Sequence, residues 1–430
     1  MPIQTLLYGL RPIEFLSWCQ RRYGNVFTVR LPLGSMTFLA DPAAIREVFA
    51  LHADDFQASS AAPLLEPFVG KRSLLLLDGE QHRQERKLIV QSFHGDSMAE
   101  YEKAMIEATR RDMATWPVGP PFALHPHTRA ITLDVILRLV FGADDQERLA
   151  ELKDVLRPWL VQAGSLLVLA PFLRHELGGR TPWGRFVRQR RAFDALVDVH
   201  IRERRADPDL GSRTDVLSLL LPHLDDASLH DELLTMLAAG HDTSATTLAW
   251  AFDLLLHHPE ALDQARGDDG YLDAVVKETL RLRPVILEVG RTMTHDTVIA
   301  GVAMPAGFAA SPSILLAQRD PFVYPDPLAF KPERFIDRPA DPSTWLPFGG
   351  GIRRCIGAAF ATMEIKTVLR TVLSEVELEP ASPKLERAKR RAVTMIPARG
   401  VRVTAGQSRP SGPPADTRTD SSFRQTAPSC

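Results

Sequence analysis

The sequence has few cysteines and no long apolar run, and both shortages narrow what the protein can be. Its 430 residues contain three cysteines, Cys19, Cys355 and Cys430, which are too few and too scattered for a disulfide framework. This usage is typical of a reducing compartment, so we expect a cytoplasmic protein. Apolar runs such as residues 166–173 are far shorter than the about eighteen residues that a membrane helix needs. We therefore expect no membrane span.

An excess of charge of one sign is also missing. The chain has 51 Lys and Arg against 53 Asp and Glu, for a formal net charge of -2, so nothing in its charge favours a nucleic-acid partner. Apolar residues at 45% and charged residues at 24% are ordinary values for a globular protein. No linker divides residues 1–406, which predicts a single domain. Residues 407–430 are rich in Ser, Pro, Thr and Asp and are expected to form a disordered tail.

The most informative stretch is a glycine-dense loop around one cysteine. Residues 348–357 read F-G-G-G-I-R-R-C-I-G, and a helix is expected at residues 356–375. Arg353, Arg354 and the helix N-terminus all favour a thiolate at Cys355, and a thiolate is the form that ligates a metal. A lone cysteine is more often a small buried apolar residue. The three glycines at 349–351 and Gly357 would let the main chain approach a flat ligand closely.

This loop resembles the cysteine-ligand loop of the cytochrome P-450 superfamily, the haem-thiolate monooxygenases. The defining positions are all present: Phe348, Gly351, Arg353, Cys355 and Gly357. The resemblance extends from the first expected hairpin to about residue 400. It implies a mainly α fold of the soluble bacterial type, a triangular helical domain with a minor β region. It also implies haem b, held without a covalent bond and with Cys355 as the axial ligand of its iron.

Two basic residues upstream are expected to share one helix face. His82 and Arg86 lie four residues apart in a segment that starts a helix near residue 78. A solvated pair on a surface helix is the common alternative. The resemblance implies instead that His82 and Arg86 bind the haem propionates, together with Arg291 and Arg353.

The longest expected helix, residues 226–258, has an unusual centre that reads A-A-G-H-D-T-S at 238–244. Glycine and short polar residues weaken a helix interior, so we expect a local bulge there, or simply a weak point between two helices. The resemblance implies that Ala239 and Gly240 border the haem and leave a groove for dioxygen. It further implies that Thr243 and Asp242 supply the protons needed for O–O cleavage.

Glu278 and Arg281 lie three residues apart, so their opposite charges share one helix face. By itself such a pair is usually an exposed ion pair that adds little to stability. The resemblance joins Glu278, Arg281 and Arg334 into a buried structural network behind the cysteine loop.

The substrate pocket is expected to be apolar, because the segments that should line it are apolar. Glu288 is the exception, and we expect it to meet a charged protein group or a polar group of the substrate. The segments are residues 64–77, 160–173, 233–239, 285–289 and 394–396, and the candidate residues are Leu77, Leu237, Val285, Glu288, Val289 and Met395.

The resemblance implies a monooxygenase that inserts one atom of O2 into a C–H bond of a hydrophobic small molecule such as a fatty acid, terpenoid or steroid. The chain has no flavin or ferredoxin signature, so a ferredoxin or flavodoxin-type partner with its reductase is expected to supply electrons to a monomer. Six basic residues could bind that partner, or they could simply face solvent: Arg83, Lys87, Arg353, Arg354, Lys366 and Arg370. The alternatives are a haem-thiolate peroxygenase or isomerase without a reductase, and a non-enzymatic haem-binding sensor.

Overall fold

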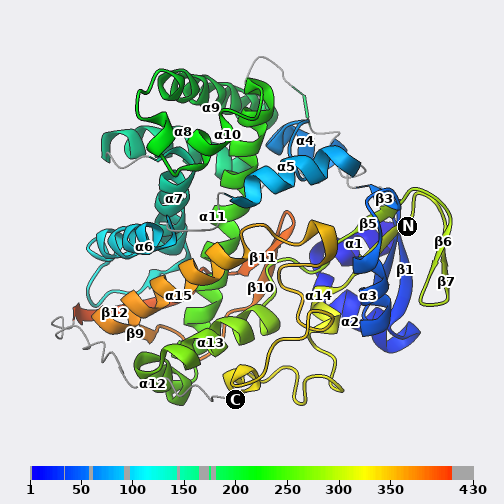
Figure 1. The fold of residues 1–430 in the computed structure, drawn as a ribbon. Coiled ribbons are helices and arrows are strands. Elements are labelled where there is room, and N and C mark those ends of the chain that lie inside the picture. The colour runs from blue at the N-terminus through cyan, green and yellow to red at the C-terminus, as the bar shows by residue number, and fades with distance from the viewer. Residues whose placement is uncertain are drawn as a thin grey trace, which may run out of the picture.

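A computed structural model describes residues 2–32, 34–57, 62–91, 97–142, 146–163, 174–175 and 181–408. The fold is mainly α with a minor β region, as predicted (Figure 1). Most of the apolar run at 160–173 and nearly all of the expected tail at 407–430 lie outside the described residues. Within the described ranges no helix is both long and apolar enough to cross a membrane.

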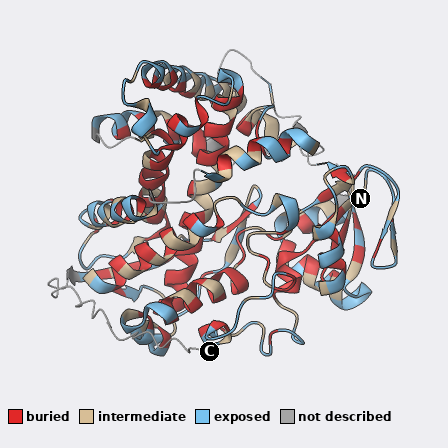
Figure 2. Cartoon of the chain, viewed as in Figure 1, coloured by how far each residue is buried: buried red, intermediate tan, exposed pale blue. Residues whose placement is uncertain are grey.

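The helix α11 (Asp226–Leu256) runs through the centre of the helical part, with α7 (His125–Phe141) packed along it (Figure 1). Its start is fixed by Asp225, whose carboxylate accepts a hydrogen bond from the Ser228 amide at 2.8 Å. Both helices are apolar on nearly every side and are buried on nearly every side, so together they form the middle of the core (Figure 2).

The largest sheet has the strand order β1-β2-β8-β5-β3 and lies beside the N-terminal helices. The predicted hairpin is present, because β1 (Val26–Leu31) pairs antiparallel with β2 (Gly34–Leu39). The strand β2 then pairs in parallel with β8 (Ala309–Pro312), which brings the C-terminal half of the chain onto this sheet. The other strands are β3 (Phe56–Gln57), β4 (Phe122–Ala123), β5 (Arg291–Met293), β6 (Thr297–Ile299), β7 (Val302–Met304), β9 (Val376–Pro380), β10 (Ala388–Arg391), β11 (Thr394–Pro397) and β12 (Arg402–Ser408).

The further helices lie around α7 and α11 or, for α1, α2, α3 and α14, beside the largest sheet (Figure 1). They are α1 (Pro2–Leu10), α2 (Pro12–Tyr23), α3 (Pro42–Ala50), α4 (Ala62–Val69), α5 (Gly79–Gln91), α6 (Ser97–Met113), α8 (Gln146–Ala163), α9 (Pro182–Arg205), α10 (Val216–Leu220), α12 (Pro259–Gly267), α13 (Asp269–Leu282), α14 (Ile314–Ala317) and α15 (Ala358–Glu375).

Two segments differ from what their sequence predicts. Pro63, Pro67 and Gly70 interrupt the periodicity of residues 56–77 and predict an irregular segment, but it contains α4, which packs against α11 although it carries Pro67 inside. Residues 285–290 are apolar apart from Glu288 and predict an extended strand, but they make only an isolated bridge between Glu288 and Ser313 before β5 begins. In both places long-range packing decides the backbone, and local sequence does not carry that information.

The structure brings Glu278, Arg281 and Arg334 together. The Arg281 guanidinium donates to both carboxylate oxygens of Glu278, at 2.6 and 2.8 Å, and both side chains are fully buried. Arg334 adds an ion pair to Glu278 at 3.4 Å. Arg281 also donates to the carbonyls of Gln318 and Pro327, each at 2.8 Å, so the network ties α13 to the loop that leads toward Cys355.

We predict that Arg281→Ala lowers the free energy of unfolding by about 3–5 kcal/mol, because Glu278 would stay fully buried with only the longer ion pair to Arg334. Urea unfolding followed by far-UV circular dichroism measures this loss. Arg30→Ala, which truncates an exposed arginine on β1, is the control and should stay within about 0.5 kcal/mol of the unchanged protein. Equal losses in the two variants would contradict the assignment.

Candidate active site

The loop that carries Cys355 is closed on itself by a backbone hydrogen bond. The Cys355 amide donates to the Phe348 carbonyl at 2.9 Å, around a single 3-10 turn at Gly351–Arg353. The following helix α15 begins at Ala358, two residues later than expected, with Gly357 as its N-cap. Cys355 therefore sits just ahead of a helix N-terminus, at the end of a fixed turn.

The glycines of this loop have a different role from the one expected. A Cβ atom at Gly350 would lie 2.2 Å from Cδ2 of Phe49, and one at Gly351 would lie 2.4 Å from the Phe49 carbonyl oxygen. Gly351 also has a φ of 64°, in the left-handed region. The expectation that the three glycines form the surface against a flat ligand is therefore wrong for Gly350 and Gly351, which seat the loop on α3. At Gly357, by contrast, a Cβ atom would meet nothing within 4 Å.

The Cys355 thiol is not made acidic by its surroundings, which corrects the sequence-based expectation. The side chain is exposed to a cavity but enclosed on its other sides, and this burial raises its pKa above the ordinary value. The amide of Gly357 and the charges of Arg86 and Arg354 lower the pKa, but they do not outweigh burial. A bound metal cation would supply the missing stabilisation of the thiolate.

The cavity beside Cys355 has a volume of about 670 Å³ and a partly basic wall. Three of the six predicted partner-binding cations line it, Arg354, Lys366 and Arg370. Their charge is partly neutralised, because Arg370 and Lys366 both pair with Asp269, at 2.8 and 3.6 Å. Of the other three, Arg83 pairs with Glu80, Lys87 is exposed, and Arg353 turns away from this cavity into the protein.

Four basic groups converge on the inner side of the loop, namely His82, Arg86, Arg291 and Arg353. Burial, together with the positive charges of Arg353, Arg86 and Arg291, lowers the pKa of His82 to about 4. Burial and the charge of Arg353 lower the pKa of Arg291 to about 10. These groups are thus close enough to repel one another.

Most acceptors in this basic cluster are neutral main-chain carbonyls, and Asp78 is its one carboxylate partner among the described residues. Arg86 donates to the Arg354 carbonyl at 2.6 Å, and Arg291 donates to the Gly290 carbonyl at 2.9 Å. Arg353 donates to the Leu74 carbonyl at 3.0 Å and pairs with Asp78 at 2.8 Å, but its Nε is buried with no acceptor among the described residues. Arg291 donates to the Gly350 carbonyl at 3.2 Å. A surplus of buried positive charge is costly unless an anion meets it. The cluster therefore fits a ligand that brings about two negative charges, as the propionates of haem would.

The middle of α11 opens where the sequence motif lies. Ala239 is exposed, and Gly240, Asp242 and Thr243 are half-buried, in a helix that is otherwise buried on nearly all sides. The helix is continuous, so the expected break is absent. The Thr243 hydroxyl donates to the Ala239 carbonyl at 2.7 Å, a type of bond that bends helices without interrupting them.

Asp242 is held by two arginines that the sequence did not reveal. Its Oδ1 atom lies 2.9 Å from Nε of Arg129 and 3.3 Å from a terminal nitrogen of Arg391. Burial would raise the pKa of Asp242, but the positive charges of Arg391 and Arg129 outweigh burial and lower it. Asp242 is therefore a carboxylate at neutral pH, and it must lose an arginine partner before it can carry a proton.

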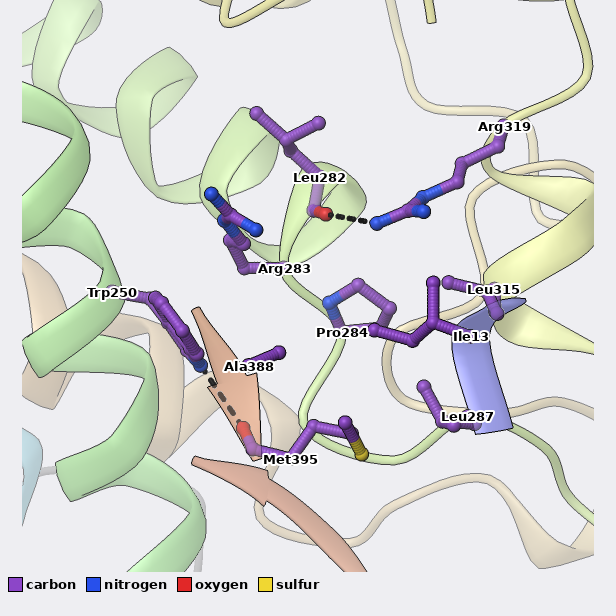
Figure 3. A pocket seen from close by; sticks show the side chains of 10 residues that line it. All are labelled: Ile13, Trp250, Leu282, Arg283, Pro284, Leu287, Leu315, Arg319, Ala388 and Met395. Atoms are coloured by element: carbon purple, nitrogen blue, oxygen red, sulfur yellow. Dashed lines mark hydrogen bonds between the residues drawn. The ribbon is translucent and has the colours of Figure 1, made fainter. Parts of the chain in front are cut away.

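The residues expected to line the substrate pocket differ in burial and in the part of the core that they join. Leu77, Leu237 and Val285 are buried, and Val289 is partly buried beside Gly349. Met395 packs in the core around α2, where its carbonyl accepts a hydrogen bond from Trp250 at 3.0 Å, so it does not join the motif on α11 (Figure 3).

Glu288 meets a protein group, but that group is a neutral hydroxyl and not the charged group that was expected. Its Oε1 accepts a hydrogen bond from the Tyr8 hydroxyl, and the charge of Arg390 acts on it as well. Burial nevertheless raises the pKa of Glu288, and its Oε2 has no partner among the described residues.

Two buried polar residues near the site escaped the sequence analysis. The Gln318 side chain donates to the carbonyls of Leu280 and Arg281 and accepts from the Leu346 amide, two residues before Phe348. Glu364 on α15 is buried with a pKa raised to about 8 by burial, and it is hydrogen-bonded to Ser244 next to Thr243. The one signal available for Glu364 was a charged residue at a position where the helical pattern predicts an apolar one.

A cysteine ahead of a helix, a basic cluster with little negative charge to balance it and an Asp-Thr pair on an opened core helix fit a haem-thiolate oxidoreductase. A family model described as Cytochrome P450 matches residues 3–403, and the chain belongs to that family. The resemblance found in the sequence is thereby confirmed.

Named proteins that are similar to this chain are also cytochromes P450. Two relatives from Mycobacterium tuberculosis carry the provisional names cytochrome P450 135B1, 42% identical over 95% of this chain and 90% of its own length, and cytochrome P450 138, 40% identical over 93% of each. The structure of a retinoic acid bound cyanobacterial CYP120A1 is similar, with a TM-score of 0.81, 26% identity and coverage of 94% of this chain and 96% of the other. CYP175A1 from Thermus is also similar, with a TM-score of 0.75, 26% identity and coverage of 92% and 95%.

His241, the neighbour of Asp242, provides a pH-dependent test of this geometry. Burial lowers the pKa of His241 to about 3, well below the value of about 6.5 in an unfolded chain. The unfolded state therefore binds the proton first, so this part of the stability is complete above about pH 6.5 and is lost as the pH falls toward 3. Between pH 7 and pH 5, His241→Gln should lose about 1–2 kcal/mol less stability than the unchanged protein.

Urea unfolding at the two pH values measures the difference. His52→Gln, at an exposed histidine, is the matched control and should follow the unchanged protein. If His241→Gln also follows it, the buried neutral state of His241 is refuted.

Proposed function

We propose that the protein is a haem-thiolate monooxygenase that inserts one oxygen atom of O2 into a C–H bond of a hydrophobic small molecule. One observation carries the proposal: the fold combines the loop-bound Cys355 with a basic cluster that has little negative charge to balance it and with the Asp242-Thr243 pair on α11. A haem-binding sensor would need the first two features but would have no use for the third.

The residues fit haem b as follows. Cys355 would be the axial ligand, and His82, Arg86, Arg291 and Arg353 would bind the two propionates through charge-assisted hydrogen bonds. Phe348 and Gly357 would border the ligand on the cysteine side, and Ala239 and Gly240 on the α11 side. When bound, the haem supplies an iron that binds and activates O2, with electron density from the thiolate.

Two residues of α11, Thr243 and Asp242, would control proton transfer. The Thr243 hydroxyl donates to the Ala239 carbonyl, and a half-turn of this hydroxyl would present its proton to the open side of the helix. Asp242 can accept a proton from solvent only after it separates from Arg129 or Arg391, because both arginines favour the charged carboxylate. The two arginines thereby control when Asp242 can act as a proton donor.

The substrate class we infer is an apolar molecule, such as a fatty acid, terpenoid or steroid. Leu77 and Val285, which are buried, and Val289, which is partly buried, support an apolar environment near the loop. The similar cyanobacterial protein was solved with retinoic acid, which is a hydrophobic acid.

Electrons would come from an external ferredoxin or flavodoxin-type partner with its reductase. The wall with Arg354, Lys366 and Arg370 lies on the cysteine side, where a partner could come closest to Cys355. An acidic partner face would compete with Asp269 and Glu102 for these cations.

Replacement of the axial ligand tests the core of the proposal. Cys355→Ala should lose the red-shifted Soret band of thiolate ligation in the reduced, CO-bound protein, because no thiolate remains to donate electron density. Cys19→Ala removes a buried cysteine of the N-terminal core and should keep the band. Retention of the band in Cys355→Ala would refute the assignment.

The hydroxyl of Thr243 can be tested through coupling. With a substrate found by spectral titration, Thr243→Ala should lower the ratio of product formed to reductant consumed by about tenfold or more, because the proton route is interrupted. Thr247→Ala, one turn later and with a similar bond to a helix carbonyl at 3.0 Å, is the control. Equal coupling in the two variants, or full turnover with peroxide and no reductase in the unchanged protein, would count against a reductase-dependent monooxygenase.

A further inference from the structure

A small cavity lies away from the cysteine, where the N-terminal core meets the helical part. It has about 10 Å³ of space and is lined by residues of α2, α11, the end of α13, α14 and the C-terminal hairpin. Figure 3 shows two arginines at its upper side and apolar side chains around the rest. The lining residues of interest are Arg283, Arg319, Trp250, Leu282 and Ile13.

Both arginines are poorly satisfied by the protein. The guanidinium of Arg283 lies over the Trp250 ring, 5.0 Å from its centre, and donates no hydrogen bond to any described residue. The guanidinium of Arg319 donates one long hydrogen bond, to the Leu282 carbonyl at 3.4 Å. The Nε atoms of both residues are buried without an acceptor. An arginine has five N–H donors, so most of this capacity is unused.

The local charge is also uncompensated. Neither arginine forms an ion pair with a carboxylate of the described chain. Asp253 acts on Arg283 only at longer range, and it already accepts a hydrogen bond from the Glu386 amide at 3.1 Å. Glu14, whose charge acts on Arg319, is exposed. Burial and the charge of Arg283 lower the pKa of Arg319 to about 10, in agreement with a positive charge that lacks a partner.

We propose that this cavity binds one monatomic anion of the chloride class between Arg283 and Arg319. Two partly buried guanidiniums, each with a buried Nε–H that has no acceptor among the described residues, favour an anion over a water molecule. The space is about that of one water-sized sphere, which favours a monatomic ion over sulfate, phosphate and carboxylates.

Such an anion would connect parts of the chain that are far apart in sequence. Arg283 ends α13, and Pro284 leads directly into residues 285–289, which are candidates for the substrate pocket. The Val285 carbonyl accepts a hydrogen bond from the Met395 amide at 2.8 Å, so the same segment is joined to the C-terminal hairpin. Anion binding would therefore stabilise the junction of α2, α13 and this hairpin.

The first test is unfolding of the full-length chain, as purified, in sodium chloride or sodium gluconate at equal ionic strength. Gluconate is too large for the cavity. At a chloride concentration ten times its Kd, the ratio of folded to unfolded protein should rise about elevenfold relative to gluconate. Arg319→Gln and Arg283→Gln should each lose this chloride dependence, whereas Arg30→Gln, at an exposed site, should keep it.

The second test locates the anion and does not depend on the variants folding. Crystals of the unchanged protein grown in sodium bromide should show an anomalous peak between the guanidiniums of Arg283 and Arg319. The proposal is overturned if no peak lies there, if chloride and gluconate stabilise the unchanged protein equally, or if a folded Arg319→Gln protein keeps the chloride effect. Neither readout uses turnover, so the result is independent of the proposed monooxygenase function.

Discussion

The buried ion pair between Glu278 and Arg281 is the interaction on which the position of the cysteine depends. Arg281 uses its remaining donors to hold carbonyls of the loop after α14, including that of Gln318. Gln318 in turn accepts the Leu346 amide, two residues before the cysteine loop begins. A charge pair far from any chemistry thus sets the course of the chain into the site. Its burial is tolerated because both carboxylate oxygens of Glu278 and all three guanidinium nitrogens of Arg281 are hydrogen-bonded.

Much of the site could be predicted because its markers are local in sequence. The loop around Cys355, the pair His82 and Arg86 on α5, and the long helix α11 each appear as a short pattern, and the fold class followed from their order. What could not be predicted depends on partners that are distant in the chain. Asp242 meets Arg129 and Arg391, which come from α7 and β10, and no spacing rule relates these three residues.

The sequence also could not show which of the opposing effects on the pKa of the Cys355 thiol is the largest. The arginines near Cys355 can be read from the sequence, but the extent of its burial cannot. Burial has the larger effect on the pKa of the thiol. The same holds for Gly350 and Gly351. Their conformational freedom was visible, but the Phe49 ring that makes it necessary lies about 300 residues away in the chain and only the fold brings it there.

The contact of the cysteine loop with Phe49 has a consequence for how a ligand could be exchanged. Gly350 and Gly351 are seated by protein atoms alone, and the loop is closed by its own hydrogen bond to Phe348. The shape of the loop therefore does not depend on what Cys355 holds. A cofactor could leave and another enter without any refolding of this turn, so the rate of exchange would be set by the opening of the helices around the site.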